Sequence, residues 1–268
     1  MNKVLYIGIL LLSIMSCAPT EQEDTVHPMD RLPDNKGGDV IKKAIAYAGG
    51  WGAWEAKKNF SFYKKITQLD STGNIRKQVK QLHQYNMKPG FQAKMSWNMD
   101  DADYIIINTG ERAKKYENDK WLEDDKSENE AWNSSYGSNY VIQMPFKLTD
   151  PGTIITYDKI DSTTFARPAH AVKVEYEKGA GSSGGMHDWW YYFDIETFDL
   201  VANYLDYGEG HSLTTYESFE DVDGIRIHKK RKSYSSNENK EIVLLRTIYE
   251  NEEMNFDTEF DDSLFKLK

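Results

Sequence analysis

From residue 59 onward, hydrophobic and polar residues alternate with a period of two, which is the pattern of β-strands buried on one face. In the first such segment Phe60, Phe62 and Ile66 share one face of the strand, and Lys64 falls on the same face. Short turn signals separate the segments, and Asp223-Gly224 is typical of a tight hairpin. The pattern predicts about eleven strands in an antiparallel sheet, with residues 116–122 as one candidate strand.

Two segments break the β pattern and predict helices. Between residues 39 and 48 the apolar residues follow helical spacing, with Asp39 as the expected N-cap and Gly49-Gly50 at the end. Residues 127–130 read Ser-Glu-Asn-Glu, which fits a capping box and predicts a helix to about residue 143. The fold class is therefore mainly β (α+β), an open antiparallel half-barrel with two helices.

One predicted strand, from Asp188 to Ile195, is aromatic on both faces. Trp189, Tyr191 and Phe193 alternate with Trp190 and Tyr192. Such a strand is buried on both faces, or it faces the core on one side and a cavity or partner on the other. Core packing is one interpretation, and a groove for a lipid or another hydrophobic ligand is the second. The candidate ligand contacts are Trp51, Trp54, Trp189, Tyr191 and Phe193.

The N-terminal residues have the pattern of a targeting signal. Residues 1–16 carry a basic residue and then an apolar run that is too short for a stable membrane span. The run ends at Ile14-Met15-Ser16-Cys17, which resembles a bacterial lipobox. The resemblance implies cleavage before Cys17 and attachment of acyl chains such as palmitate to it. Residues 17–38 are then expected to be a flexible tether, and residues 39–268 a single domain.

The predicted anchor also bears on location. Ala18 follows Cys17, instead of the Asp that signals inner-membrane retention in enterobacterial lipoproteins, so the outer membrane is favoured. The acidic run 21–24 resembles an export signal of surface lipoproteins, or it is a solvated part of the tether. The periplasmic face and the cell surface both remain open, and we expect a monomer.

Composition excludes several classes of protein. The net charge of −10 argues against nucleic-acid binding, which needs an excess of Lys and Arg. The single cysteine excludes a disulfide framework and a Cys-based zinc site. Leu, Ile, Val and Phe reach only about a fifth of the chain, near the range of disordered proteins, but aromatic residues make up 13%. An aromatic β core accounts for both figures.

Catalytic and metal-binding patterns are not evident in the sequence. His187-Asp188 is the sharpest pair, yet adjacent strand residues point to opposite faces. We therefore predict no enzymatic activity, no cofactor and no metal. A carboxylate-dependent hydrolase, with His170 or His187 in a pocket, remains an alternative. The basic run Lys229–Lys232 suggests a solvated edge strand or a contact with anionic headgroups.

The order of elements resembles a known envelope architecture. A lipidated N-terminus, a helix, strands, a central helix and further strands are similar to the LolA/LolB fold of lipoprotein-sorting proteins. The stretches 44–54, 144–152 and 188–194 resemble uncharacterised lipoproteins of the Bacteroidota. The resemblance implies a half-barrel that binds an acyl chain, a lipid or a lipoprotein, and no catalytic residue. The rival hypothesis is a glycan- or protein-binding module without a cavity.

Overall fold

The computed structural model describes residues 26–165, 167–182, 184–261 and 263–268. The predicted signal peptide and Cys17 lie outside these residues. The helices are η1 (Pro28–Arg31), α1 (Lys36–Tyr47), α2 (Trp51–Glu55), α3 (Asp125–Ile142) and η2 (Phe146–Thr149), η1 and η2 being 3-10 helices. The strands are β1 (Asn59–Leu69), β2 (Ile75–Asn86), β3 (Gln92–Met99), β4 (Ala102–Asn108), β5 (Ala113–Glu117), β6 (Lys120–Trp121), β7 (Thr153–Asp161), β8 (Ala169–Tyr176), β9 (Asp188–Asp194), β10 (Leu200–Asp206), β11 (His211–Val222), β12 (Ile225–Ser236) and β13 (Ile242–Phe256).

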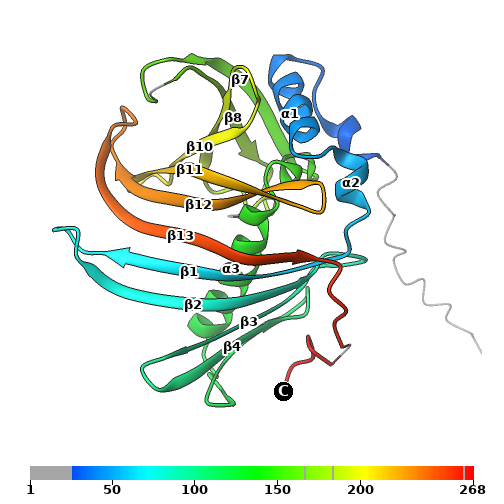
Figure 1. The fold of residues 1–268 in the computed structure, drawn as a ribbon, viewed down its shortest axis with the longest axis vertical. Coiled ribbons are helices and arrows are strands. Elements are labelled where there is room, and N and C mark those ends of the chain that lie inside the picture. Colours follow the sequence, from blue (N-terminus) through cyan, green and yellow to red (C-terminus); the bar gives the residue numbers. More distant parts are fainter. Residues whose placement is uncertain (1–25, 166, 183, 262) are drawn as a thin grey trace, which may run out of the picture.

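The described strands form one antiparallel sheet in the order β6-β5-β4-β3-β2-β1-β13-β12-β11-β10-β9-β8-β7. The chain runs as a meander from β1 to the edge strand β6 and continues through α3 to the opposite edge, β7. A second meander returns from β7 to β13, which pairs with β1 in the middle of the sheet. The sheet curves around α3 as an open half-barrel (Figure 1), so the predicted fold class is confirmed.

Helix α1 covers one end of the half-barrel and packs against β7. The Asn35 side chain caps it by accepting hydrogen bonds from the backbone N–H groups of Gly37 and Gly38, at 2.8 and 3.0 Å. The expected cap at Asp39 is therefore wrong. The 3-10 helix η1, the buried Leu32 and the start of α1 at Lys36 place residues 28–38 in the folded domain, so the predicted tether does not extend to residue 38.

The segment after α1 lies directly on the β11–β12 hairpin. The backbone N–H of Arg226 donates to the carbonyl of Ala48 at 3.0 Å. Gly49 has a φ of +114°, and a Cβ there would lie 2.2 Å from the carbonyl oxygen of Gly224. Only glycine fits this close approach. The chain then enters α2, which the sequence did not predict, and Trp54 of α2 stacks on Phe146 with ring centroids 4.4 Å apart.

Helix α3 passes across the inside of the half-barrel and contacts β3, β4 and β5. Asp124 caps it by accepting from the N–H of Ser127 at 2.8 Å, so the capping residue precedes the predicted capping box. Ser135 is fully buried in this contact and accepts a hydrogen bond from the amide of Asn108 at 3.0 Å. The helix predicted over 127–143 is thus confirmed with a start two residues earlier.

Strand β9 packs aromatic side chains on both of its faces, and the side chains from Tyr191 to Asp194 are buried. Tyr191 and Phe193, with Trp189 packed beside them, belong to the large core cluster inside the half-barrel. Tyr192, with Trp190 beside it, belongs to a second cluster on the outer face. Aromatic residues therefore build the core on both sides of this part of the sheet.

Two sequence predictions about the strands differ from the structure. The strand expected over residues 116–122 is instead a hairpin of two short strands, β5 and β6, over residues 113–121, and the described strands number thirteen where about eleven were predicted. Strand β12, which carries the basic run Lys229–Lys232, lies between β11 and β13 and is not an edge strand. Among the described residues, no helix is both long and apolar enough to span a membrane.

Candidate functional site

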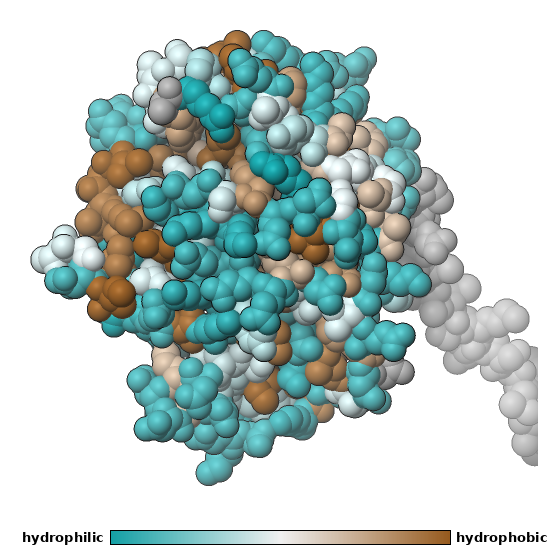
Figure 2. Space-filling model, viewed as in Figure 1, coloured by the Kyte–Doolittle hydropathy of each residue, from teal (hydrophilic) through white to brown (hydrophobic). Residues whose placement is uncertain are grey.

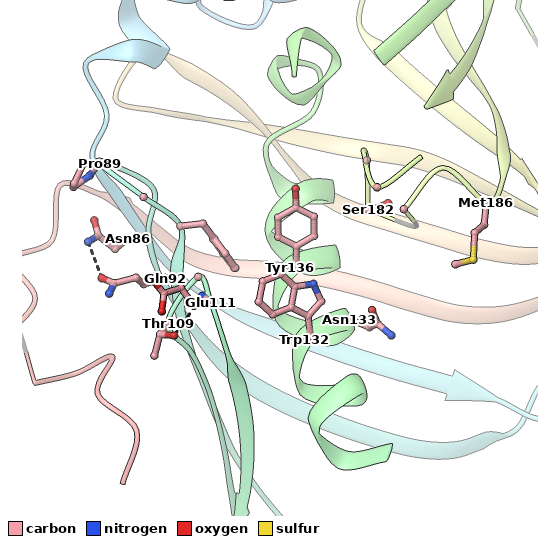
Figure 3. Close-up of a pocket in the computed structure, with 16 residues that line it drawn as sticks. Asn86, Pro89, Gln92, Thr109, Glu111, Trp132, Asn133, Tyr136, Ser182 and Met186 are labelled. Carbon is pink, nitrogen blue, oxygen red and sulfur yellow. Dashed lines mark hydrogen bonds between the residues drawn. The ribbon is translucent and has the colours of Figure 1, made fainter. Parts of the chain in front are cut away.

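Two neighbouring cavities lie on either side of α3, and together they form the candidate site. The outer cavity, of about 720 Å³, lies between α3, the turns β2–β3 and β4–β5, and the loop β8–β9 (Figure 3). The inner cavity, of about 340 Å³, lies between α3 and strands β1 and β9–β13. Asn133 and Ser182 line both cavities, so the two are adjacent.

The outer cavity has an apolar wall and a polar rim. Trp132 and Tyr136 project from α3 into it, and Phe91 meets the Tyr136 ring at 5.4 Å (Figure 3). Met186 lines the side formed by the β8–β9 loop and is 75% exposed. These side chains offer apolar surface that is accessible from solvent, which is the character of a site for a hydrophobic group.

The inner cavity exists because α3 presents small side chains to the sheet. Ser134, Gly137, Ser138 and Val141 recur at helical spacing, so they share the face of α3 that lines this cavity. A Cβ added at Gly137 would meet no atom within 4 Å. Larger residues at these positions would fill the space between helix and sheet.

Two buried cations face each other across the floor of the inner cavity. Lys64 of β1 is 8% exposed and Arg231 of β12 is 7% exposed. The Lys64 ammonium donates to the Ser138 hydroxyl at 2.8 Å and lies 5.2 Å from the Tyr249 ring centroid. The Arg231 guanidinium carbon lies 4.8 Å from the same ring, and its Nε has no hydrogen-bond partner among the described residues.

The cross-strand register explains why these groups meet. Arg231 is paired with Tyr249 on β13 and with Tyr216 on β11, so the three side chains form one row across the sheet. Tyr216 in turn donates its hydroxyl hydrogen to the amide oxygen of Asn203 at 3.1 Å. The row places Arg231 between two aromatic rings, where cation–π contact supports the guanidinium.

Burial changes the titration of the basic groups around this floor. Burial first, and then the charge of Arg231, lower the pKa of Lys64 to about 7. Burial and the Lys64 charge hold the pKa of His83 well below its usual value. Burial, and then the charges of Arg231 and Lys64, also hold the pKa of His228 well below its usual value. Both histidines are therefore neutral at pH 7, while Lys64 titrates near that pH.

The residues that line the inner cavity include no Asp and no Glu. Lys64 also lines a smaller neighbouring cavity of about 280 Å³, which contains the Glu130 carboxylate. That carboxylate is held 3.3 Å from the Lys115 ammonium. The inner cavity is thus a polar, basic space without a carboxylate of its own.

The five aromatic residues predicted as ligand contacts lie in two places. Trp189 and Tyr191 line the inner cavity, with ring centroids 6.0 Å apart. Trp51, Trp54 and Phe193 pack in the core cluster and do not line the inner or the outer cavity. The structure thus brings two of the five to the site, and ligand binding by any of them stays a prediction.

Sequence reasoning missed Lys64 and Arg231 as site residues, although both left a signal. Lys64 is in phase with Phe60 and Phe62 on the buried face of its strand. Arg231 alternates with Lys230 and Lys232, whose ammonium groups pair with Glu250 at 3.1 Å and Glu217 at 3.0 Å. The signal at Lys64 was a cation at a position where the alternation predicts an apolar residue. The signal at Arg231 was a cation on the opposite face of the strand from the two lysines beside it.

The histidines weighed for catalysis lie elsewhere. His170 is 3.2 Å from the Tyr157 hydroxyl and stacks on Phe198, and His187 lies beside the ring of Tyr207. Neither lines the inner or the outer cavity. Within the described part of the chain, no group of three His, Cys, Asp or Glu side chains could hold a metal ion.

One part of the exposed apolar surface lies at the start of β13. Ile242 and Val243, at the start of β13, are 52% and 65% exposed. Figure 2 shows a continuous apolar area at the end of the curved sheet where β13 begins, surrounded by hydrophilic surface. This surface is aliphatic, in contrast to the aromatic interior.

Comparison with known proteins identifies a family and a fold. The sequence model of a protein family described as "Family of unknown function (DUF6503)" matches residues 36–260. No curated protein matches this chain.

Three solved structures are similar over most of their length. A DUF1329 family protein from Desulfovibrio piger has a TM-score of 0.55 at 9% identity, over 87% of this chain and 98% of that one. A LolA superfamily protein from Nitrosomonas europaea has a TM-score of 0.55 at 8% identity, and the match covers 86% of this chain and 97% of that one. A domain from Vibrio parahaemolyticus, assigned to outer membrane lipoprotein sorting, has a TM-score of 0.52 at 10% identity. The match covers 86% of this chain and 96% of that one. At this identity the likeness establishes a LolA-like fold.

Proposed function

We propose that this chain, which belongs to DUF6503, a family of unknown function, is a lipid-anchored envelope protein that binds an acyl-chain ligand beside α3. The ligand is a lipid, a free acyl chain or the acyl part of a lipoprotein. The anchor is attached at Cys17, and the outer membrane is its site. Binding would consist of sequestering the chain from water, without catalysis.

The observation that carries the proposal is the pair of adjacent cavities. Their volumes, about 720 and 340 Å³, are those of ligand sites in proteins, which range over about 300–1,000 Å³. The outer cavity offers Phe91, Trp132, Tyr136 and Met186 to an acyl chain. Apolar surface buried there would contribute about 25 cal/mol per Å².

The two rival functions predict different surroundings. A glycan- or protein-binding module without a cavity predicts a filled half-barrel and an exposed aromatic patch, whereas this molecule has cavities and an aliphatic patch at Ile242 and Val243. A carboxylate-dependent hydrolase predicts acidic groups close to His170 or His187 in a pocket. The inner cavity is basic instead, and neither histidine lines it. Cavity binding is therefore favoured.

Native mass spectrometry of the protein purified from its own envelope tests this proposal. We expect a bound species whose mass corresponds to a lipid or an acyl chain. Added fluorescent acyl probes should compete with that species. A clean apo mass together with no response to the probes would refute cavity binding.

The anchor is tested separately from the cavity. Cys17→Ser removes the thiol that the acyl chains require, so we expect the protein to move from the membrane fraction to the aqueous fraction. Ser16→Gly keeps a small residue before the cysteine and is the matched control. A variant that lacks Cys17 but stays on the membrane would show that the protein is held there by other means.

A further inference from the structure

We propose that Lys64 and Arg231 form a binding centre for one anionic group, the head of a single-chain amphiphile whose tail occupies the outer cavity. This inference rests on the proposed function and names the ligand class more closely. Carboxylate and phosphate head groups share the required chemistry, since both accept hydrogen bonds from ammonium and guanidinium groups.

The first support is that both cations are buried without a counterion. No described carboxylate lies within ion-pair distance of either, and the Lys64 ammonium is hydrogen-bonded only to the neutral Ser138 hydroxyl. The Nε of Arg231 is buried and has no partner in the described residues. Buried charges in proteins are normally paired or fully hydrogen-bonded, because desolvation is costly. Two adjacent buried basic groups without a carboxylate partner favour an anionic ligand.

The second support is the contrast with the other cations of β12. Lys229, Lys230 and Lys232 all pair with glutamates, at 2.8, 3.1 and 3.0 Å respectively. Arg231 lies among them in sequence and alone faces the cavity. The strand therefore balances its charge on the outer face and leaves one cation unbalanced on the inner face.

The third support is that the groups around the cations are neutral or basic. His228 from β12, His83 from β2, Tyr216 from β11 and Tyr249 from β13 face the cations from the sheet, and Ser138 faces them from α3. An anion between Lys64 and Arg231 would relieve their mutual repulsion and meet no carboxylate in the inner cavity. A cationic head would meet only like charges there.

The position of the two cavities determines the orientation of the ligand. The inner cavity is adjacent to the outer one through Asn133 and Ser182. A chain that extends from the cations past Asn133 reaches Trp132 and Tyr136 on the outer side of α3 (Figure 3). In this arrangement the head would lie against Lys64 and Arg231, and the tail against Trp132 and Tyr136.

The test compares three amphiphiles of equal chain length on the full chain: dodecanoate, dodecyl phosphate and dodecanol. Dissociation constants are measured by displacement of a fluorescent acyl probe. We expect one or both anions to bind about tenfold or more tightly than dodecanol, because charged hydrogen bonds are worth at least that ratio. A preference for dodecanoate identifies a carboxylate head, and a preference for dodecyl phosphate identifies a phosphate head.

Lys64→Met and Arg231→Met should each remove this preference, so that each variant binds the two anions no more tightly than it binds dodecanol. Lys230→Met, on the outer face of the same strand, is the matched control and should keep the preference. A second readout needs no variant: the bound anion should raise the pKa of Lys64 above about 7 in an NMR titration, and dodecanol should not. Equal binding of all three amphiphiles, with no effect of the variants, overturns this inference and leaves the proposed function standing. Binding of none overturns both.

Discussion

Strand β1 crosses two regions of the half-barrel that differ in how they are filled. At its start, Phe60 packs against Phe256 with ring centroids 4.4 Å apart, and aromatic rings from α2 and η2 complete a closed core. Farther along the same face, Lys64 lies under small residues of α3 and beside a cavity. Burial alone therefore does not distinguish core from site along this strand. What differs is whether the facing helix supplies rings or small polar side chains.

The largest expected effect tests the packed region. Phe146→Ala should lower the free energy of unfolding by about 3–5 kcal/mol, because a ring stacked on Trp54 in a closed core leaves a void. Urea unfolding measures the change. Trp189→Ala removes a ring from the cavity wall, and we expect less than about half of that loss, since part of this ring already borders open space. Equal losses would mean that the cavity region is packed as tightly as the core.

The next effect concerns the pH dependence of the cavity region. The pKa of Lys64 is about 7 in the folded protein and near 10.5 when the chain is unfolded. Between these values the unfolded state binds more protons, so stability should rise with pH, at up to about 1 kcal/mol per pH unit. Lys64→Met should lack this rise relative to the wild type in urea unfolding from pH 7 to 9.

Lys65→Met is the control for that experiment. Lys65 follows Lys64 in the strand but points to the outer face, where its ammonium is 3.8 Å from the Glu250 carboxylate. The Lys65 variant should therefore follow the wild-type pH profile. Parallel profiles for the wild type and Lys64→Met would contradict the burial of an unpaired lysine.

A smaller effect of opposite sign is expected on α3. Gly137→Ala should raise the free energy of unfolding by about 1 kcal/mol, because alanine favours the helix and its Cβ meets open space. Gly137→Leu should instead fill part of the inner cavity and weaken the binding of acyl probes. Thermal unfolding and probe titration give the two readouts. Undiminished binding in the leucine variant would place the ligand outside the inner cavity.

The smallest effect is expected on the outer face. Lys230→Met breaks an exposed ion pair with Glu250 and should cost no more than about 1 kcal/mol. Comparison with Arg231→Met, one residue away, contrasts the two faces of β12 directly. A large loss of stability in Lys230→Met would mean that the ion pairs with glutamate on the outer face contribute strongly to the stability of the sheet. The two faces of β12 would then differ less in their contribution to stability than their geometry indicates.

Much of the fold was readable because a period of two is a local signal. The hairpin at Asp223-Gly224 followed from residues that are neighbours in sequence, and so did the aromatic character of both faces of β9. The division of the predicted strand 116–122 between the two strands β5 and β6 was missed. It depends on Asn118 and Asp119, whose positive φ angles of 48° and 64° form a tight turn within what reads as one strand.

The site was less predictable, because it depends on long-range placement. Strand β11 carries register shifts between Tyr216 and Phe219, opposite β12, and each shift changes which residues face inward. The side that Arg231 faces could not be assigned from alternation alone. The cavity itself requires α3 to cross the sheet, and no local pattern shows that Ser138 would lie 2.8 Å from Lys64.

The pairing of β1 with β13 has a consequence for how the site comes into being. Lys64 belongs to the first strand of the sheet, and Arg231 to the strand just before the last one. Bringing these two strands together closes a loop that contains most of the chain. Because closing so long a loop has a high entropic cost, we expect this step to come late in folding. A partly synthesised or truncated chain would hold Lys64 without Arg231 and would have no binding centre. An anion that bridges the two would also join the two meanders, and its occupancy would then report that the chain is complete and closed.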